Sequence, residues 1–221
     1  MNEDNIENCV IVQYGTYISD NNIFIIMKEF SSTDEKIIKA TFGILQREGF
    51  AKATTKKIAA EAGVNEVTIF RNFQNKNNLV EITKEYYLQR YLEKMEEIFD
   101  FNEDDEIEDY LQSNFIGILN LSENEYNIIK LAMEEVRNIP DKKQLISRIT
   151  DTIISKLEEF FKTQMEKGKI RQVDARVLAG MCFSITFQSI ILLKVYDLSP
   201  SVETNKYAHN FLDILYYGIK D

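Results

Sequence analysis

From residue 33 onward, apolar residues recur every three or four positions, which is the spacing of an amphipathic helix. Ser32 and Thr33 come just before the acidic pair Asp34 and Glu35, so we expect one of these two hydroxyls to cap a helix that ends at Gly49. The inward face of this predicted helix consists of Ile37, Ala40, Thr41, Ile44 and Leu45.

Two short helices are predicted next, on either side of Gly63. Thr54 can cap the first helix, Gly63 supplies a left-handed turn, and Asn65 can cap the second. The inward residues are Ile58, Ala59 and Ala62 in the first helix and Ile69 and Phe73 in the second. The outward residues of the second helix are Glu66, Val67, Phe70 and Arg71. Two short, angled helices with one exposed face are typical of a helix-turn-helix, although the turn alone fits a plain helical hairpin equally well.

The rest of the chain predicts longer helices and an all-α fold. With two prolines and eight glycines, few residues interrupt the helical pattern. The expected helices cover residues 76–99, 107–121, 123–138, 142–167, 174–196 and a final segment after Ser199-Pro200. We therefore expect three parts: an N-terminal extension at 1–30, a helix-turn-helix domain at 31–79, and a larger helical domain at 80–221.

The first 30 residues differ from the remainder. Two runs of β-branched and aromatic residues flank Ser19-Asp20-Asn21-Asn22, which predicts a hairpin with no other strand to pair with. Such a hairpin is marginally stable in water. We expect this extension to be either disordered or not native, with translation starting at Met27.

Charge is distributed unevenly along the chain, whose net charge is −10. Residues 31–79 carry eight Lys or Arg against five Asp or Glu and sum to +3, whereas residues 1–30 sum to −4 and residues 80–221 to −9. A mildly basic segment on an acidic body can orient a protein on a polyanion. This asymmetry is compatible with DNA binding but does not establish it.

Cysteine usage and hydropathy favour a cytoplasmic protein. Cys9 and Cys182 lie far apart without a metal-ligand spacing, and no secretory signal is recognisable. The longest apolar run, residues 177–193, contains Ser, Thr and Gln and is better explained as a buried helix than as a membrane span. We expect no metal, no cofactor and no membrane partner.

A specific family resemblance emerges at residues 37–79. The Gly49-Phe50 pair, the Thr-rich start of the next helix, Ile-Ala-x-x-Ala-Gly-Val at 58–64 and Phe-x-x-Lys at 73–76 together resemble the DNA-binding domain of the tetracycline-repressor (TetR) family. The resemblance covers about a fifth of the chain. It implies a transcriptional regulator whose second short helix reads the major groove of double-stranded DNA.

The resemblance also implies roles for individual residues. The implied phosphate contacts are Thr55, Lys56, Asn65 and Lys76. The implied recognition helix and its end comprise Glu66, Val67, Thr68, Phe70, Arg71 and Asn72. Arg71 is the candidate for a bidentate contact to guanine, although it can equally grip a phosphate.

Four positions depart from the family pattern, and one of them is Lys57, which replaces the usual acid and so removes the reciprocal capping box with Thr54. Val67 stands where the family usually has Gly, Phe70 where it has Tyr, and Asn72 where it has His. Phe70 loses a phenolic phosphate contact, and Val67 can pack against a thymine methyl group. We therefore expect the operator sequence of this protein to differ from those of family members that carry the usual residues.

In the TetR family, the later helices enclose a pocket for a small, often apolar effector. Aromatic and Met residues are plentiful here, and core packing is the simpler explanation for any single one of them. The candidate pocket residues are Tyr87, Tyr91, Met95, Phe115, Tyr126, Met133, Phe161 and Phe183. By resemblance, the helices near 174–197 and 201–218 form a homodimer interface; burial of residues 174–196 within one monomer is the alternative.

These features predict a ligand-responsive regulator, most simply a repressor that a small apolar effector releases from a palindromic operator. An enzyme fits poorly, because the single histidine, His209, falls in the predicted dimer helix and no acid/base pair or phosphate loop is evident. The alternative is a helical protein-interaction module with a vestigial helix-turn-helix.

Overall fold

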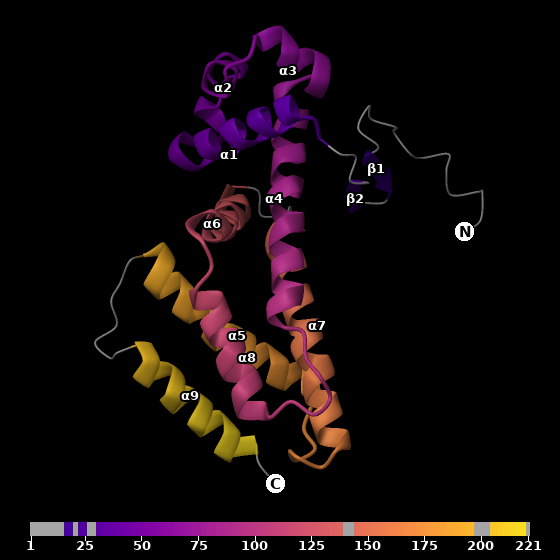
Figure 1. The fold of residues 1–221 in the computed structure, drawn as a ribbon, viewed down its shortest axis with the longest axis vertical. Helices are drawn as coiled ribbons and strands as arrows, with labels where there is room; N and C mark the ends of the chain where they lie inside the picture. Colours follow the sequence, from indigo (N-terminus) through magenta and orange to yellow (C-terminus); the bar gives the residue numbers. More distant parts are fainter. Residues whose placement is uncertain (1–15, 20–21, 26–29, 139–143, 197–203, 220–221) are drawn as a thin grey trace, which may run out of the picture. The chain divides into compact units, whose positions relative to one another are not determined.

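The computed structural model describes residues 16–19, 22–25, 30–138, 144–196 and 204–219 (Figure 1). The chain divides into two compact units, Met1–Tyr87 (unit 1) and Leu88–Asp221 (unit 2). The described residues are helical apart from one short hairpin and the connecting turns, so the predicted all-α fold is confirmed.

Unit 1 begins its helical part with α1, Ser32–Lys52. The cap is Ser31, so the prediction of Ser32 or Thr33 was wrong by one or two positions. Ser31 has extended backbone angles, and its hydroxyl accepts from the Asp34 amide while the Asp34 carboxylate accepts from the Ser31 amide. This reciprocal capping box satisfies two amides that the first helical turn leaves unpaired.

Gly49 interrupts α1 without ending it. Its φ of 75° and ψ of 172° are not helical, yet one further turn continues to Lys52. The predicted end of the helix at Gly49 is therefore a kink. A residue with a Cβ is strained at such a positive φ, which explains the glycine there.

The two short helices are α2, Thr55–Ala62, and α3, Glu66–Phe73. Both predicted caps are confirmed: Thr54 accepts from the Lys57 amide, and Asn65 accepts from the Val67 amide. Gly63 lies between the helices in the left-handed conformation, with φ 67° and ψ 35°. This local chemistry forms the predicted helix-turn-helix.

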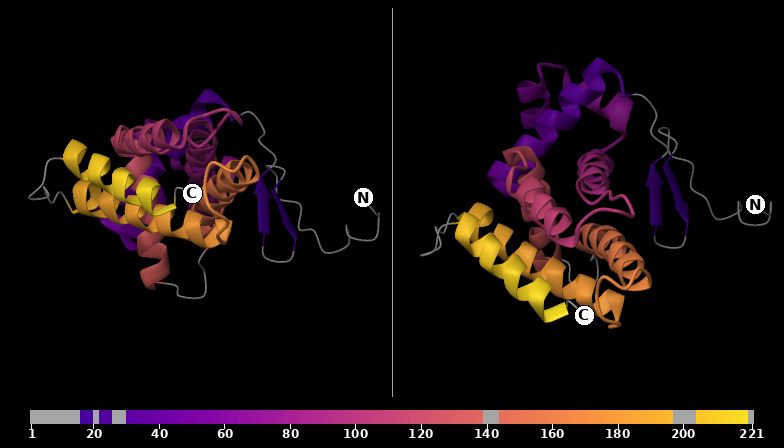
Figure 2. Two further views of the ribbon diagram at one scale, coloured as in Figure 1. Left: turned by 90° about the horizontal axis from the view of Figure 1, so that it is seen from below. Right: turned by 60° about the horizontal axis from the view of Figure 1, so that its bottom comes forward.

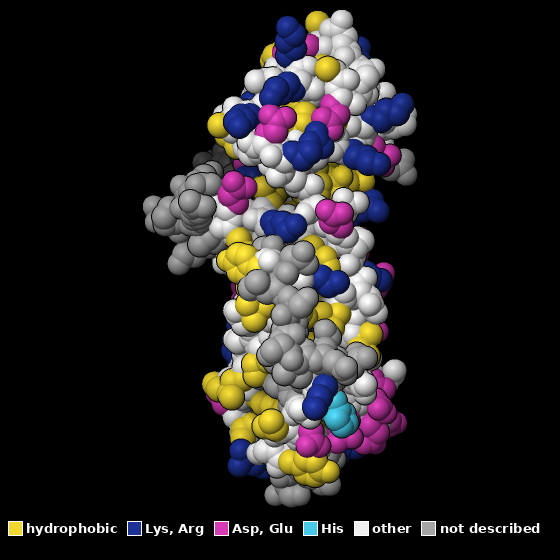
Figure 3. Space-filling model, turned by 90° about the vertical axis from the view of Figure 1, so that its left-hand side faces the viewer, with side chains coloured by type: hydrophobic (Ala, Val, Ile, Leu, Met, Phe, Trp, Pro, Cys, Tyr) yellow, Lys and Arg dark blue, Asp and Glu magenta, His cyan; other side chains and the backbone are white. Residues whose placement is uncertain are grey.

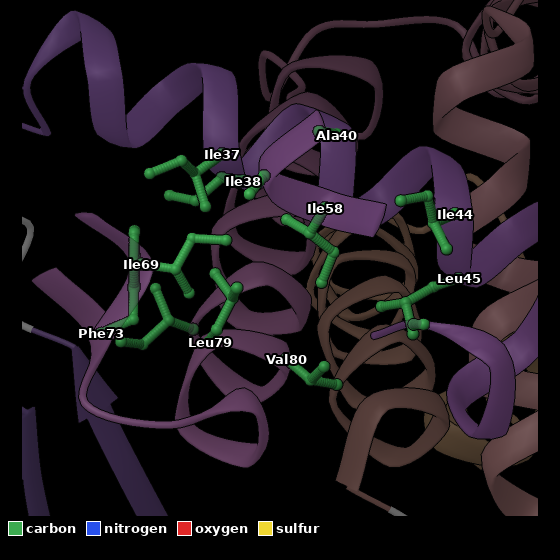
Figure 4. Close-up of a cluster of buried hydrophobic side chains, with 13 residues drawn as sticks. Ile37, Ile38, Ala40, Ile44, Leu45, Ile58, Ile69, Phe73, Leu79 and Val80 are labelled. Atoms are coloured by element: carbon green, nitrogen blue, oxygen red, sulfur yellow. The ribbon is translucent and has the colours of Figure 1, made fainter. Parts of the chain in front are cut away.

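The core of unit 1 comes from α1, α2, α3 and the start of α4, Lys76–Ile98 (Figure 4). From α3, Ile69 and Phe73 enter it and are completely buried, as predicted. They meet Ile37 and Ile38 from α1 and Leu79 from α4 in the same cluster. Burial of each large side chain contributes about 1.5–3 kcal/mol, so α3 is held by its two inward residues.

Unit 2 contains the rest of α4 and five further helices within the described residues. These are α5, Ile107–Leu119; α6, Glu123–Asn138; α7, Gln144–Glu166; α8, Ala175–Ile190, which continues as a π-helical turn over Ile191–Val195; and α9, Thr204–Ile219. Helix α5 ends two residues before its predicted end, and residues 142 and 143 of the predicted seventh helix lie outside the described residues. Helix α8 packs on α7, and α9 packs on α5 (Figure 2).

Helix α8 is capped by Asp174, which accepts from the Val177 amide, and is apolar around most of its circumference. In the described part of the chain, the segment Ala175–Lys194 is the one helix long and apolar enough to cross a membrane. A core or interface helix of a soluble protein passes the same test, so this property is weak evidence for membrane insertion.

The predicted N-terminal hairpin is present as β1, Thr16–Ser19, and β2, Asn22–Ile25. The strands are antiparallel, with Thr16 opposite Ile25 and Ser19 opposite Asn22. Met27, the predicted translation start, lies outside the described residues. The division of the chain at residues 30 and 79 stays a prediction.

We expect Ile69→Ala to lower the free energy of unfolding by about 2–5 kcal/mol, because the change leaves a cavity in the core of unit 1. Val67→Ala is the matched control on the same helix, because its side chain is 69% exposed, and it should change stability by no more than about 0.5 kcal/mol. Urea unfolding of both variants, followed by circular dichroism, measures the difference. Equal losses would contradict the assignment of inward and outward faces of α3.

Candidate nucleic-acid interface and interior cavities

The outward face of α3 combines apolar and polar side chains. Val67 is 69% exposed and Phe70 is 48% exposed, and Arg71 is exposed beside them. Glu66 and Thr68 are half-buried. Exposed apolar side chains on a short capped helix form a surface suited to thymine methyl groups and base edges.

Thr55 and Glu66, both predicted to contact DNA, have side chains that are hydrogen-bonded to each other. The Thr55 hydroxyl donates to the Glu66 carboxylate at 2.6 Å, which joins the first residue of α2 to the first residue of α3. A hydroxyl has a single proton, so Thr55 cannot donate to a phosphate while it donates to Glu66. The backbone amides at the start of α2 are better placed for an anion, because the first turn of a helix leaves them without helical partners.

The cations near the turn fall into two groups. Arg47 pairs with Glu61 at 2.6 Å and Lys57 pairs with Glu48 at 2.7 Å, and the Lys57 hydrogen bond lowers the pKa of Glu48. Lys56 is exposed and makes no ion pair with the described residues. Figure 3 shows the resulting surface, with Lys and Arg side chains of unit 1 interspersed with Asp and Glu. Lys56 and Arg71 are therefore the cations of this region that are most available to an incoming phosphate.

Arg71 and Asn72, at the end of α3, are linked to the start of α1. The Arg71 Nε donates to Asn72 Oδ1 at 3.1 Å, and Asn72 Nδ2 donates to Asp34 Oδ1 at 2.8 Å. Asp34 is buried and belongs to the capping box of α1. Asn72 is therefore held between the two charged side chains.

Lys76, the first residue of α4, lies against the chain at the kink in α1. Its ammonium donates to the Phe50 carbonyl at 2.8 Å and lies 4.1 Å from the centre of the Phe50 ring. A cation over an aromatic face is favourable by about 0.5–1 kcal/mol at an exposed site. The Lys76 ammonium has three N–H donors, so it can donate to a phosphate as well as to the Phe50 carbonyl.

Two small, mostly apolar cavities lie among the described residues of unit 2. One has a volume of about 20 Å³ and the other about 10 Å³. Since one water molecule needs about 10–15 Å³ by the same measure, neither cavity has room for an effector. Phe99, Ile118, Leu157 and Thr186 line both cavities. The side chains that line both cavities therefore separate these two small voids from each other.

Three of the eight predicted pocket residues line these cavities: Phe115 lines the larger one, and Tyr91 and Phe183 line the smaller one. Met95 and Phe161 are buried outside both linings, and Met133 is half-buried. Tyr87 belongs to unit 1, where its ring stacks on Phe42 with centroids 3.6 Å apart.

Tyr126 has a structural role of its own. Its hydroxyl donates to the Ile118 carbonyl, and burial raises its pKa to about 12. The phenol therefore remains protonated at neutral pH and acts as a hydrogen-bond donor from α6 to the end of α5.

Nine residues beyond the eight candidates also line these cavities. These are Phe99, Leu111, Asn114, Ile118, Ile153, Leu157, Cys182, Thr186 and Phe187. Burial raises the pKa of the Cys182 thiol to about 12, so this cysteine is an uncharged lining residue. Asn114, with its amide nitrogen facing the Ile98 and Tyr110 carbonyls, is satisfied by both of them.

Gln164 on α7 is completely buried, and neither atom of its carboxamide has a hydrogen-bond partner among the described residues. It lies about two helical turns from Leu157, on the same face of α7. An unpaired buried amide costs about 1–3 kcal/mol. This polar group is therefore conspicuous on an otherwise apolar inward face.

The described residues contain no group of three His, Cys, Asp or Glu that could hold a metal ion. His209 is exposed on α9.

Comparison with known proteins matches residues 37–82 to the family model "Bacterial regulatory proteins, tetR family". The matched range contains the whole of α2 and α3. It ends inside α4, so the match covers the helix-turn-helix and the core that supports it.

Similarity to individual proteins extends beyond this range. YvkB, an HTH-type transcriptional regulator of Bacillus subtilis (strain 168), is 32% identical over 157 residues, which cover 70% of this chain and 79% of YvkB. A fatty acid metabolism regulator protein of the same organism is 24% identical over 196 residues, covering 87% and 98% of the two chains. The crystal structure of a TetR transcription regulator from Haloarcula marismortui ATCC 43049 has the same fold, with a TM-score of 0.66, 18% identity, and coverage of 87% of this chain and 100% of that one.

We expect Lys56→Ala to weaken binding to duplex DNA of any sequence and to reduce the salt dependence of binding by about one counterion. The reason is that an unpaired surface lysine acts on phosphate through its charge. Lys130→Ala, at an exposed position on α6, is the matched control and should leave binding unchanged. Fluorescence anisotropy across a salt series measures the slope, and an unchanged slope for Lys56→Ala would contradict the phosphate contact.

Proposed function

Because this chain belongs to the tetR family of bacterial regulatory proteins, we propose that it is a cytoplasmic, dimeric repressor that leaves a palindromic operator when a small apolar effector binds. The observation that carries the proposal is the exposed outward face of α3 on a helix whose inward face is completely buried. Such a helix is rigidly presented for the major groove. The contacts are expected from Lys56, Val67, Phe70 and Arg71 and from the amides at the start of α2.

Exposed apolar residues on α8 and α9 support a dimer. Val177 is 60% exposed and Met181 is 56% exposed on α8, and Ile214 and Tyr217 on α9 are 74% and 66% exposed. Large apolar side chains grouped on two helices favour burial against a second copy of the chain. An open groove of about 550 Å³, lined partly by Val177 and Met181, gives such a partner a place to insert side chains.

The small size of these two cavities supports an effector that enlarges them when it binds. Pockets for small molecules usually measure about 300–1,000 Å³, far more than either void. An apolar molecule entering at Leu157 and Thr186 would have to join the two cavities and displace the aromatic side chains around them. Displacement of this kind couples binding to the packing of α5, α7 and α8.

A fatty acid is the effector class that we infer. One relative over most of this chain is a fatty acid metabolism regulator, and the cavity linings are mostly apolar. An acyl chain matches such a lining, and the unpaired Gln164 carboxamide on the same face of α7 offers a hydrogen-bonding group for a carboxyl head. Effector binding can release DNA only to the extent that it favours the non-binding arrangement, so operator DNA must weaken effector binding by the same factor.

Selection of bound duplexes from a random DNA pool should yield a two-fold symmetric motif with half-sites about one helical turn apart. Met181→Glu places a charge on the exposed apolar face of α8, so it should yield monomers and lower operator affinity by at least tenfold. Size-exclusion chromatography with light scattering measures the oligomeric state. Val67→Ala is a control that should remain dimeric. No enriched motif from a folded, dimeric protein would favour the protein-interaction module instead.

Palmitic acid should release the protein from the selected operator, whereas acetate at the same concentration should not, because only the former carries an apolar chain. Thr186→Phe fills space that both cavities share and should weaken the response to palmitic acid by tenfold or more while operator binding persists. Ile116→Phe, at a position that is 45% exposed on α5, is the matched control and should respond normally. Fluorescence anisotropy of labelled operator measures release; no release by palmitic acid would contradict the fatty-acid assignment.

A further inference from the structure

We propose that Asn72 is a positioning residue that directs Arg71 toward the DNA, and that Asp34 at the start of α1 sets this direction. The three side chains form an unbroken chain of hydrogen bonds from α1 to the end of the recognition helix. The inference rests on the DNA-binding role proposed above. It assigns part of the sequence specificity to a buried carboxylate outside the helix-turn-helix.

The bonds allow one orientation of the Asn72 amide. Its oxygen accepts from the Arg71 guanidinium, and its nitrogen donates to the Asp34 carboxylate. Arginine can only donate and a carboxylate can only accept, so exchanging the two amide atoms would lose both bonds. Both bonds involve a charged partner and are therefore stronger than bonds between neutral groups.

Asp34 is itself held in place. One of its carboxylate oxygens accepts from the Ser31 hydroxyl at 2.6 Å and from the Ser31 amide at 3.2 Å, while the other accepts from Asn72. The side chain is 9% exposed. The capping box therefore holds one end of this series of hydrogen bonds at the buried start of α1, and the exposed Arg71 forms the other end.

Arg71 takes part in this series of hydrogen bonds through its Nε alone. The two terminal nitrogens of its guanidinium have no hydrogen-bond partner among the described residues, and the side chain is exposed. These two nitrogens make the fork that can bind guanine O6 and N7 together. Fixing Nε limits the rotamers of a flexible side chain before DNA arrives, which reduces the entropy lost on binding.

The competing role for Asn72 is a DNA contact of its own. To reach a base or phosphate, its amide would have to release Arg71, Asp34 or both, and leave the buried Asp34 carboxylate with one partner fewer. A buried charge that loses a partner is destabilising. The observed bonds therefore favour the indirect role.

A double-mutant cycle on the operator selected by the wild-type chain tests the proposal. Asn72→Ala and Arg71→Ala should each lower operator affinity by about tenfold or more. If Asn72 acts through Arg71, the double variant should bind as weakly as Arg71→Ala alone. If the double variant instead loses affinity by the product of the two single-variant factors, Asn72 contacts DNA independently and the proposal is overturned.

Asp34→Ala tests the buried end of the chain of bonds, with Ser31→Ala as the matched control. Both variants weaken the capping box, but only Asp34→Ala removes the acceptor of Asn72. Asp34→Ala should lower operator affinity by about tenfold in the presence of Arg71 and not in the Arg71→Ala background. Ser31→Ala leaves the residue 31 amide to bond the Asp34 carboxylate and should therefore lower affinity much less. Equal losses from both variants would assign the effect to capping and overturn the role of Asp34.

Renewed selection from a random pool gives a readout that stability does not affect. Asn72→Ala should relax base preference at the same operator position as Arg71→Ala, and a change at another position would overturn the proposal. If the wild-type chain itself enriches no motif, the proposed regulator fails together with this inference. If the wild-type chain enriches a motif but the affinity losses of Asn72→Ala and Arg71→Ala multiply, the inference about Asn72 is overturned while the proposed regulator stands.

Discussion

The arrangement of α3 depends on the burial of two side chains, Ile69 and Phe73, in the core of unit 1. A helix of eight residues is too short to be stable by itself in water, so tertiary packing has to hold it. Both side chains lie on one face, which leaves the opposite face to solvent. The outward face of α3 is therefore free to contact DNA because only two side chains of this helix are needed to anchor it in the core.

Local chemistry explains why so much of the fold was predictable from the sequence. Periodic apolar residues predicted the positions of the helices, and Thr54, Gly63 and Asn65 predicted the turn, because caps and left-handed turns depend on neighbours within four positions. The errors were local as well. Ser31, Ser32 and Thr33 are all suitable caps, and the reciprocal bond with Asp34 selects Ser31.

The functional details were less predictable, because they depend on contacts between distant parts of the chain. The bond from Thr55 to Glu66 and the bond from Asn72 to Asp34 join residues 11 and 38 positions apart, and no spacing rule connects them. In unit 2, residues that line a cavity have the same periodicity as residues that fill a core. Phe115 and Phe161 look alike in sequence, and only the packing shows that one borders a void.

The hydrogen bond between Thr55 and Glu66 has a consequence for how DNA specificity can evolve. Glu66 opens the recognition helix, and its carboxylate accepts from a residue of the preceding helix. A substitution at position 66 removes the acceptor of Thr55, so that hydroxyl then needs another acceptor. The two positions should therefore change together among paralogues that diverge toward new promoters, and a graft of α3 alone into another scaffold would separate one member of the pair from the other.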